Sequence, residues 1–485
     1  MLNKHRYFSL ALAAFILLSS AVSCGKDSNS DNADDDSGTV SNDMADETDV
    51  RDTADDLPEA NYDGYVFRIL VDDDYKQYIM TDEINGSVVN DAVYTANTNV
   101  MERFNIKLEQ VRHNSWTDSA QVRSLILSGE DAFDLGIVHD NMSATLSLED
   151  LFVDLYTVPH LNFEKPWWPE YTIESLTLNG RMYLISNAMT YYGFHSTRCM
   201  FFNKDLAENY KWESPYDMVR NGTWTLDNVI IMTKDIYEDL DGNNTADYND
   251  LYGFACTVPY CLLENFGIEA YEKSADGKTV ALKINNERTV NLLDKMVGWL
   301  NSGEIGTYYS STHSGRYNPD SSNTMFANGN VVLTYGAIGH LLTGLADTYT
   351  NYGILPTPKY DEQQENYIGA CTEIPGIIPV TAVDLDRTGM IVEALSAEGY
   401  RHLVPAYYEL ALKNRYTYDT DSVEMLELMF DNRVLSFSYM YAPTMQQVIN
   451  NVLGGNTNFA SFYASRESAE LVNIEKINAF YNKER

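Results

Sequence analysis

Residues 239–250 have the spacing that is most specific for one kind of chemistry. Residues able to supply an oxygen ligand recur along the segment, at Asp239, Asp241, Asn243, Thr245, Asp247 and Asp250. Thr245 stands where calcium-binding loops use a backbone carbonyl, so the loop can gather about six or seven oxygens around one hard cation. We therefore expect a structural Ca²⁺ ion that staples this loop, with a solvated turn as the alternative.

Two positions of the loop depart from the usual calcium-binding pattern. Asn244 stands where Gly is usual, and Asn tolerates the left-handed backbone conformation needed there. Asp250 replaces a longer, bidentate Glu and so has a shorter reach. We therefore expect weak binding, with a dissociation constant of about 10⁻⁴ to 10⁻³ M.

Cys24 is the second position with a specific chemistry. A basic start at residues 4–6 is followed by an apolar run at 8–18 and by small residues up to Ser23. The run is too short to cross a bilayer, and the layout resembles a bacterial lipoprotein signal peptide at residues 1–23. Cleavage there would leave Cys24 as a lipidated first residue, on the extracytoplasmic face of the cell membrane. An uncleaved anchor helix is the alternative, and it would place the folded part on the same side of the membrane.

An acidic segment separates Cys24 from the globular part. Residues 24–60 are rich in Asp, Glu, Ser, Asn, Thr and Gly and show no apolar periodicity, which predicts a disordered tether. The whole chain has 33 Lys and Arg against 71 Asp and Glu, a net charge of -38. This charge disfavours nucleic acid and anionic lipid as ligands of the folded part.

The remaining cysteines suggest no metal centre. Cys199, Cys256, Cys261 and Cys371 form no CxxC pair and have no zinc-ligand spacing. A disulfide between Cys256 and Cys261 is possible outside the cell, but buried free thiols are favoured.

The start of the globular part alternates strands and helices. Apolar strands are predicted at 65–71, 106–111 and 133–138, with helices at 87–104 and 119–127 between them. This order is typical of an α/β fold with a parallel sheet covered by helices. Ligands meet such sheets at the carboxyl ends of the strands, which here carry Asp73, His139 and Asp140.

A series of short motifs carries a more specific resemblance. The motifs occupy residues 133–138, 151–155, 165–168, 179–184, 201–206, 221–226, 325–330, 351–359 and 405–409. Their order and spacing over most of residues 61–440 resemble the extracellular solute-binding proteins of ABC importers, and most of all the family-1, maltose-binding-protein-like type.

The resemblance implies an α/β, two-lobe periplasmic-binding-protein-like (type II) fold with hinge strands and a central cleft. The first crossing between lobes falls near residues 194–198 and the second near 335–339. One lobe would comprise residues 61–195 plus 337–390. The other would comprise residues 196–336 plus 391–485.

The same resemblance suggests which residues bind the ligand. His139, Asp140 and Asp73 follow strands of the first lobe, Ser196 and Tyr335 stand at the crossings, and Tyr260 corresponds to a sugar-stacking position of the second lobe. Trp168 belongs to the motif at 165–168. Because the chain contains 35 Tyr, 18 Phe and 6 Trp, an acidic, aromatic cleft suits the C–H faces and hydroxyls of a carbohydrate.

These observations predict a membrane-tethered lipoprotein that captures a solute, an oligosaccharide by preference, and delivers it to an ABC permease. We expect it to act as a monomer. We also expect no catalysis, because no HExxH, GxSxG, GxxxxGK or GxGxxG template occurs in the sequence. A lipid-anchored glycan-degrading enzyme and a surface glycan-adhesion protein remain as alternatives.

Overall fold

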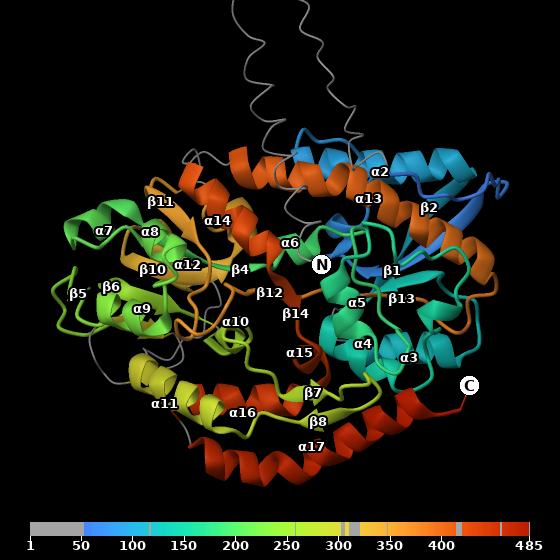
Figure 1. Ribbon diagram of the computed structural model, residues 1–485. Helices are drawn as coiled ribbons and strands as arrows, with labels where there is room; N and C mark the ends of the chain where they lie inside the picture. The colour runs from blue at the N-terminus through green and yellow to red at the C-terminus, as the bar shows by residue number, and fades with distance from the viewer. Residues whose placement is uncertain are drawn as a thin grey trace, which may run out of the picture. The chain divides into compact units, whose positions relative to one another are not determined.

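Two β-sheets organise the part of the chain that follows residue 56, which forms one compact unit in the computed structural model (Figure 1). The structure describes residues 53–115, 118–257, 259–301, 306–309, 321–346, 348–413, 420–455 and 458–484. The predicted signal peptide, Cys24 and most of the predicted tether lie outside these residues. No helix among the described residues is long and apolar enough to span a membrane.

The first sheet has the strand order β13-β3-β1-β2. Its strands are β1 (Tyr65–Asp72), β2 (Ile106–His113), β3 (Leu135–Ile137) and β13 (Gly376–Ile377). β1 is parallel to β2 and β3, whereas β13 is antiparallel to β3. The connecting helices are α2 (Val88–Phe104) and α3 (Ser119–Leu127), and α13 (Leu385–Lys413) packs along α2. The predicted alternation of strands and helices is therefore confirmed.

The second sheet has the order β11-β4-β10-β6-β5, with β9 paired to β6. Its strands are β4 (Arg198–Asn203), β5 (Tyr237–Glu238), β6 (Leu251–Cys256), β9 (Thr307–Tyr309), β10 (Val331–Ala337) and β11 (Tyr352–Leu355). Its helices are α7 (Lys204–Asn209), α8 (Pro215–Arg220), α9 (Leu226–Thr233), α11 (Glu287–Asn301) and α12 (Ser321–Ala327). Cys199, Cys256, Cys261 and Cys371 are buried free thiols, as favoured by the sequence.

The other elements surround the two sheets. Helices are α4 (Asp140–Ser147), α5 (Glu170–Leu176), α6 (Tyr192–His195), α10 (Leu262–Asn265), α14 (Thr420–Asp431), α15 (Phe437–Tyr441), α16 (Pro443–Leu453) and α17 (Phe459–Asn482). In Figure 1, α14 lies above the second sheet, and α16 and α17 lie along the lower edge. Two further strand pairs are β7 (Tyr271–Lys273) with β8 (Val280–Leu282), and β12 (Gly369–Cys371) with β14 (Arg433–Leu435).

The chain returns from the second sheet to the first later than expected. The crossing was expected near residues 335–339. After β10 the chain stays in the second sheet, because β11 pairs with β4. It reaches the first sheet only at β13, so the range 337–390 contributes to both sheets. Both are short buried strands, and their side chains do not specify which sheet they join. The other lobe boundaries stay a prediction.

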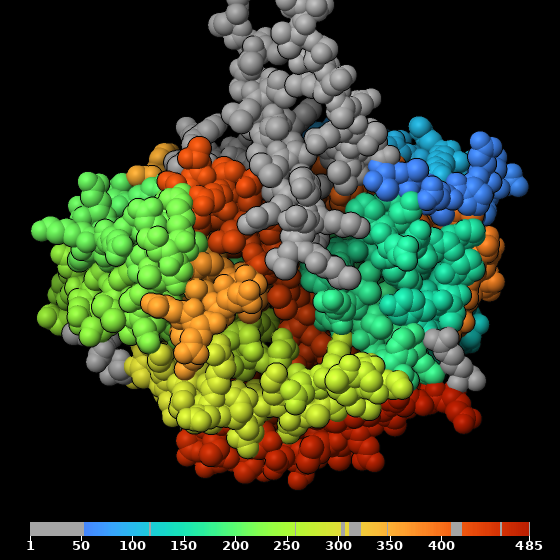
Figure 2. All heavy atoms as spheres, in the orientation of Figure 1, coloured from blue at the N-terminus to red at the C-terminus, as the bar shows by residue number. Residues whose placement is uncertain are grey.

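The β7–β8 hairpin forms a bridge between the parts built on the two sheets. Lys273 Nζ donates to the backbone oxygens of Glu174, Ser175 and Thr177 at the end of α5, at 2.6, 2.6 and 2.9 Å. The hairpin turn accepts a hydrogen bond from Asn179 N at 2.7 Å. In Figure 2 the yellow-green surface of this region accordingly lies against teal residues of the first part.

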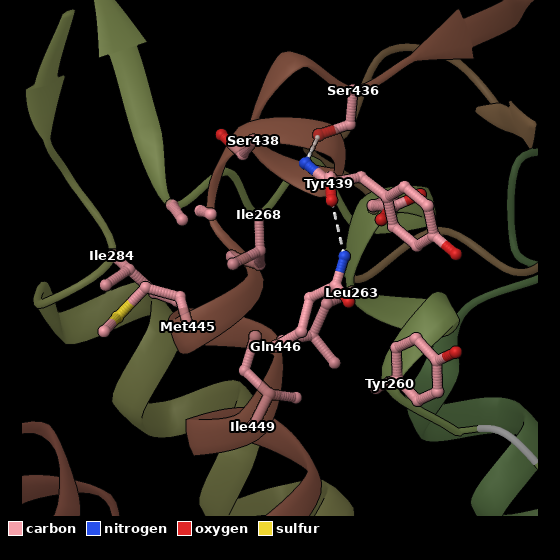
Figure 3. Close-up of a pocket in the computed structure, with 13 residues that line it drawn as sticks. Tyr260, Leu263, Ile268, Ile284, Ser436, Ser438, Tyr439, Met445, Gln446 and Ile449 are labelled. Atoms are coloured by element: carbon pink, nitrogen blue, oxygen red, sulfur yellow. Dashed lines mark hydrogen bonds between the residues drawn. The ribbon is translucent and has the colours of Figure 1, made fainter. Parts of the chain in front are cut away.

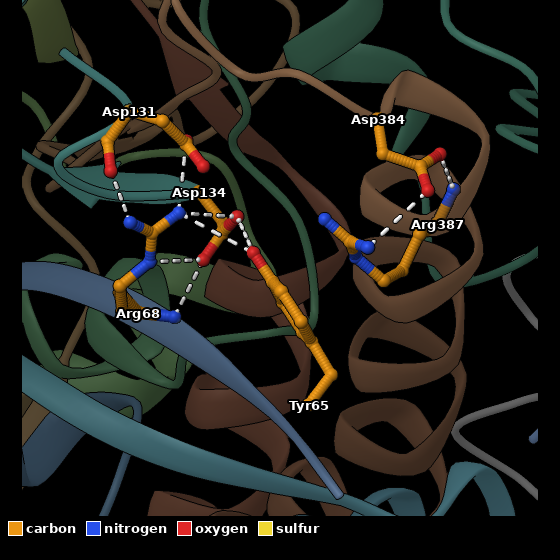
Figure 4. A network of polar contacts seen from close by, with 6 residues as sticks. All are labelled: Tyr65, Arg68, Asp131, Asp134, Asp384 and Arg387. Atoms are coloured by element: carbon orange, nitrogen blue, oxygen red, sulfur yellow. Dashed lines mark hydrogen bonds and ion pairs between the residues drawn. The ribbon is translucent and has the colours of Figure 1, made fainter. Parts of the chain in front are cut away.

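A polar network fixes the beginning of the first sheet (Figure 4). The Asp134 side chain is 1% exposed and accepts hydrogen bonds from Tyr65 Oη (2.6 Å), Arg68 N (2.7 Å) and Arg68 Nε (3.0 Å). Arg68 also pairs with Asp131 at 2.8 Å, and the Arg387 guanidinium of α13 lies 3.5 Å from the centroid of the Tyr65 ring. Asp134 therefore joins β1 to the segment that leads into β3.

Replacing Asp134 by Ala should lower the free energy of unfolding by about 2 to 3 kcal/mol, because it leaves several donors unpaired beside a partly buried guanidinium. Asp131→Ala is the matched control, since its side chain is 31% exposed and its loss should cost less than about 1 kcal/mol. Urea unfolding measures both. Equal losses for the two variants would contradict the role given to Asp134.

Candidate functional site

The segment between the two sheets is lined with aromatic rings. Ile185 still bridges to Gly376 beside the first sheet, and Arg198 begins β4 of the second, so the chain passes from the first sheet to the second between these two residues. Tyr192 of α6 lies 4.9 Å from Tyr78, centroid to centroid. Tyr78 Oη is also 3.3 Å from His195 Nε2. The crossing is thus packed against the loop that follows β1.

Asp140 lies where β3 ends, at the first position of α4, and it is 2% exposed. Its Oδ1 accepts a hydrogen bond from Asn141 N at 2.6 Å and lies 2.9 Å from His139 Nδ1. Burial raises the pKa of Tyr439, and the negative charge of Asp140 raises it further. Asp140 therefore acts electrostatically on a residue that follows the second sheet in the chain.

The facing wall comes from the short helices η4 (Pro259–Cys261), α10 and α15. Tyr260, Glu264 and Tyr439 line a pocket there of about 30 Å³, which Figure 3 shows together with apolar residues of α16. A pocket of this volume has room for only a few water-sized groups and not for a whole sugar ring. Burial raises the pKa of Glu264 well above its usual value, and nearby Glu269 adds to the effect.

Arg198 lies between these walls. Burial lowers the pKa of its guanidinium, but the surrounding groups, with Cys261, Tyr335, Tyr439 and Tyr260 as the main contributors, raise it overall. Burial and the positive charge of Arg198 together lower the pKa of His195 to about 4. The junction therefore combines carboxyl groups, a guanidinium and aromatic hydroxyls.

Two predicted site residues have structural partners at the crossing. Tyr335 of β10 is 2% exposed, and its hydroxyl donates to Asn265 Oδ1 at 3.3 Å. Ser196 is 5% exposed; its Oγ donates to Thr372 O at 2.6 Å and accepts from Thr372 N at 3.1 Å. Ser196 therefore joins the two crossing segments, while Tyr335 lies near Arg198.

The structure places Asp73 and Trp168 among other partners. Asp73 pairs with Arg112 at 2.8 Å and accepts from Gln110 at 2.9 Å, both residues of β2. Trp168 is 4% exposed, and its Nε1 donates to Glu393 at 2.9 Å. Neither joins the group of Asp140, Tyr260, Glu264, Tyr439 and Arg198, which we call the junction cluster.

Sequence reasoning missed three members of the junction cluster. Arg198 carried a usable signal, because a single charged residue directly precedes a buried strand at the predicted crossing. Glu264 and Tyr439 had no signal of their own, since the fold brings them together from α10 and α15.

Comparisons with solved structures identify the fold of this chain. No protein-family model and no curated protein sequence matches this chain. M. tuberculosis UspC, in its monoclinic crystal form, superposes with a TM-score of 0.56 at 14% identity, covering 84% of this chain and all of UspC. The GacH receptor of Streptomyces glaucescens GLA.O gives 0.55 at 13% identity, covering 85% of this chain and 99% of the receptor. The chain has the α/β, two-lobe fold of periplasmic binding proteins.

The predicted calcium loop brings three carboxylates together. One oxygen each of Asp239, Asp241 and Asp250 lie within 4.8 Å of one another. Oxygens that share a Ca²⁺ ion at about 2.3 to 2.6 Å are at most about 5 Å apart, so this group fits the ion. Asn244 has a φ of 57°, the left-handed conformation expected there.

The other predicted ligands complete the turn. Asn243 Nδ2 donates to Asp241 at 2.9 Å and to Asp247 at 3.2 Å, and Asn243 Oδ1 accepts from Thr245 N at 2.6 Å. Asp250 is fully buried and accepts from Tyr237 Oη at 3.0 Å, a partner that the sequence did not suggest.

We propose that this loop binds Ca²⁺ as a structural ion. At a hundredfold excess of Ca²⁺ over the dissociation constant, the free energy of unfolding should rise by about 2.7 kcal/mol. Asp241→Asn should remove most of this gain, whereas Asp276→Asn, in the exposed turn of β7–β8, should retain it. Thermal melting in calcium and in chelator measures the effect. An unchanged wild-type melting temperature in chelator would contradict the site.

Proposed function

We propose that this chain is a solute-binding protein that holds its ligand between the two lobes. The observation that carries the proposal is the junction cluster, in which Asp140 follows the first sheet and Tyr260 and Glu264 belong to the second part. Burial and Glu269 raise the pKa of Glu264, and Asp140 raises it further. Asp140 on the first side and Glu264 on the second are therefore within electrostatic reach of each other.

The preferred ligand is a carbohydrate. Aromatic rings pack on the C–H faces of sugars, and carboxyl, guanidinium and tyrosine groups bind their hydroxyls. The junction cluster offers both kinds of group. The GacH receptor, to which this chain is similar in fold, was solved unliganded and in complex with acarbose and an acarbose homolog, which supports the choice.

The proposal extends to location and partners. Lipid on Cys24 would hold the protein at the extracytoplasmic face of the cell membrane, where a monomer passes its ligand to an ABC permease. The Cys24→Ala chain should leave the membrane fraction or keep its signal peptide. Cell fractionation and the mass of the product measure this, and membrane retention of a product of mature size would contradict the lipid anchor.

Closure of the lobes around the ligand is the proposed mechanism, because contacts with both walls exist together only in the closed form. Asp140→Asn and Tyr260→Ala should each weaken binding by about 1 to 3 kcal/mol. Matched controls are Asp386→Asn, whose carboxylate pairs with His160 at 2.8 Å, and Tyr156→Ala, an exposed tyrosine.

Calorimetry over mono- and oligosaccharides measures affinity, and X-ray scattering with and without the bound sugar should show contraction. Steady release of sugar by the wild type would favour the enzyme. Tight binding of a polymer without contraction would favour the adhesion protein. Equal losses in the control variants would contradict the junction cluster as the site.

A further inference from the structure

Arg198 is a charged residue of the proposed site that has no partner among the described residues. Its Nε is buried without a hydrogen-bond acceptor. Within the described part of the chain, its side chain forms neither an ion pair nor a hydrogen bond, although Cys261 and several tyrosines lie close enough to influence its pKa. The N–H groups of the guanidinium are therefore available to hydrogen-bond a bound ligand.

A neighbouring arginine has the contacts that Arg198 lacks. Arg433 lies 3.8 Å from the centroid of the Phe194 ring and donates from Nε to Phe430 O at 3.4 Å. A guanidinium that loses contact with water and gains no partner destabilises the folded chain. Arg198 therefore lowers the free energy of unfolding of the ligand-free protein. A ligand that supplies acceptors removes this cost.

The surroundings of Arg198 indicate where those acceptors would lie. Tyr260 and Tyr439, which lie close enough to Arg198 to influence its pKa, both line the pocket of Figure 3. Their rings offer apolar faces, and Glu264 lies beside them. A ligand group that reaches Arg198 therefore lies next to aromatic rings and hydroxyl partners.

We infer, on the basis of the proposed function, that the ligand is an acidic glycan and that Arg198 binds the carboxylate of one of its uronic acid residues. The planar guanidinium presents paired N–H groups that match the two oxygens of a carboxylate. A single sugar hydroxyl offers one oxygen and leaves the second donor of the pair unmatched.

Two of the nearby carboxyl groups, Glu264 and Glu373, are compatible with this binding. Burial raises the pKa of Glu264 well above its usual value, and burial raises that of Glu373 to about 7. Both groups therefore keep their protons to higher pH than an exposed Glu. In protonated form they donate hydrogen bonds to ligand oxygens instead of repelling a carboxylate.

Matched pairs of oligosaccharides test the inference. Each pair has the same ring and linkage but differs at C6: galacturonate against galactose, glucuronate against glucose, and mannuronate against mannose disaccharides and trisaccharides. At least one acidic member should bind at least tenfold more tightly than its neutral partner. A tripeptide with a free carboxylate, against its amide, distinguishes a peptide terminus as the source of the carboxylate.

Variants of Arg198 connect the preference to this residue. Arg198→Gln should abolish the preference, because it should weaken binding of the acidic member at least tenfold more than binding of its neutral partner. Arg198→Lys should retain only part of it, because a single ammonium lacks the paired donors. Arg112→Gln is the matched control, since Arg112 pairs with Asp73 on β2 and should leave the preference intact.

A measurement without ligand completes the test. Arg198→Met should melt at or above the wild-type temperature, because it removes a partly buried charge that has no partner among the described residues. A clearly lower melting temperature would mean that Arg198 has partners within the protein, and would overturn the inference.

The binding outcomes separate the inference from the proposed function. Equal or tighter binding of the neutral sugars overturns the acidic ligand and leaves solute capture standing. Binding of the free-acid peptide alone overturns the glycan. Failure of every sugar and peptide to bind overturns both.

Discussion

The structure depends on one constraint, which is that two separate segments of the chain must pass side by side between its sheets. The Ser196 hydroxyl bonds both the carbonyl and the N–H of Thr372, at 2.6 and 3.1 Å, and Ile185 bridges to Gly376. These contacts hold the segment that leads from the first sheet to the second beside the segment that returns to the first sheet. The Glu373 carboxyl group packs closely against Gly193, at the place where a Cβ would otherwise lie. The crossing is therefore a packed unit, and the junction cluster is built around it.

The alternation of strands and helices and the place of Asp140 were predictable because they depend on local sequence. Hydrophobic periodicity identified β1, α2, β2 and α3, and the rule for parallel sheets placed Asp140 at the end of β3. The left-handed Asn244 followed from its own side-chain chemistry. Such features need no knowledge of distant residues.

The remaining features depend on partners far along the chain. Trp168 was a candidate ligand-binding residue because of its motif, and the sequence does not show that its indole nitrogen donates to Glu393, which is buried in α13. β11 joined the second sheet although its position suggested the first lobe, because the choice depends on pairing with β4. The isolation of Arg198 is likewise a property of the assembled junction, since only the fold decides which carboxylates come near it.

The position of Arg198 also suggests an order of events in binding. Arg198 is the first residue of β4, directly after the crossing, so lobe rotation moves it less than it moves residues farther from the hinge. An anionic group meeting this guanidinium would be held first near the hinge. Asp140 from one wall and Tyr260 and Tyr439 from the other then add contacts that the open form lacks. The free energy of closure would therefore come from the walls, while the unpaired charge at the hinge selects the ligand that starts it.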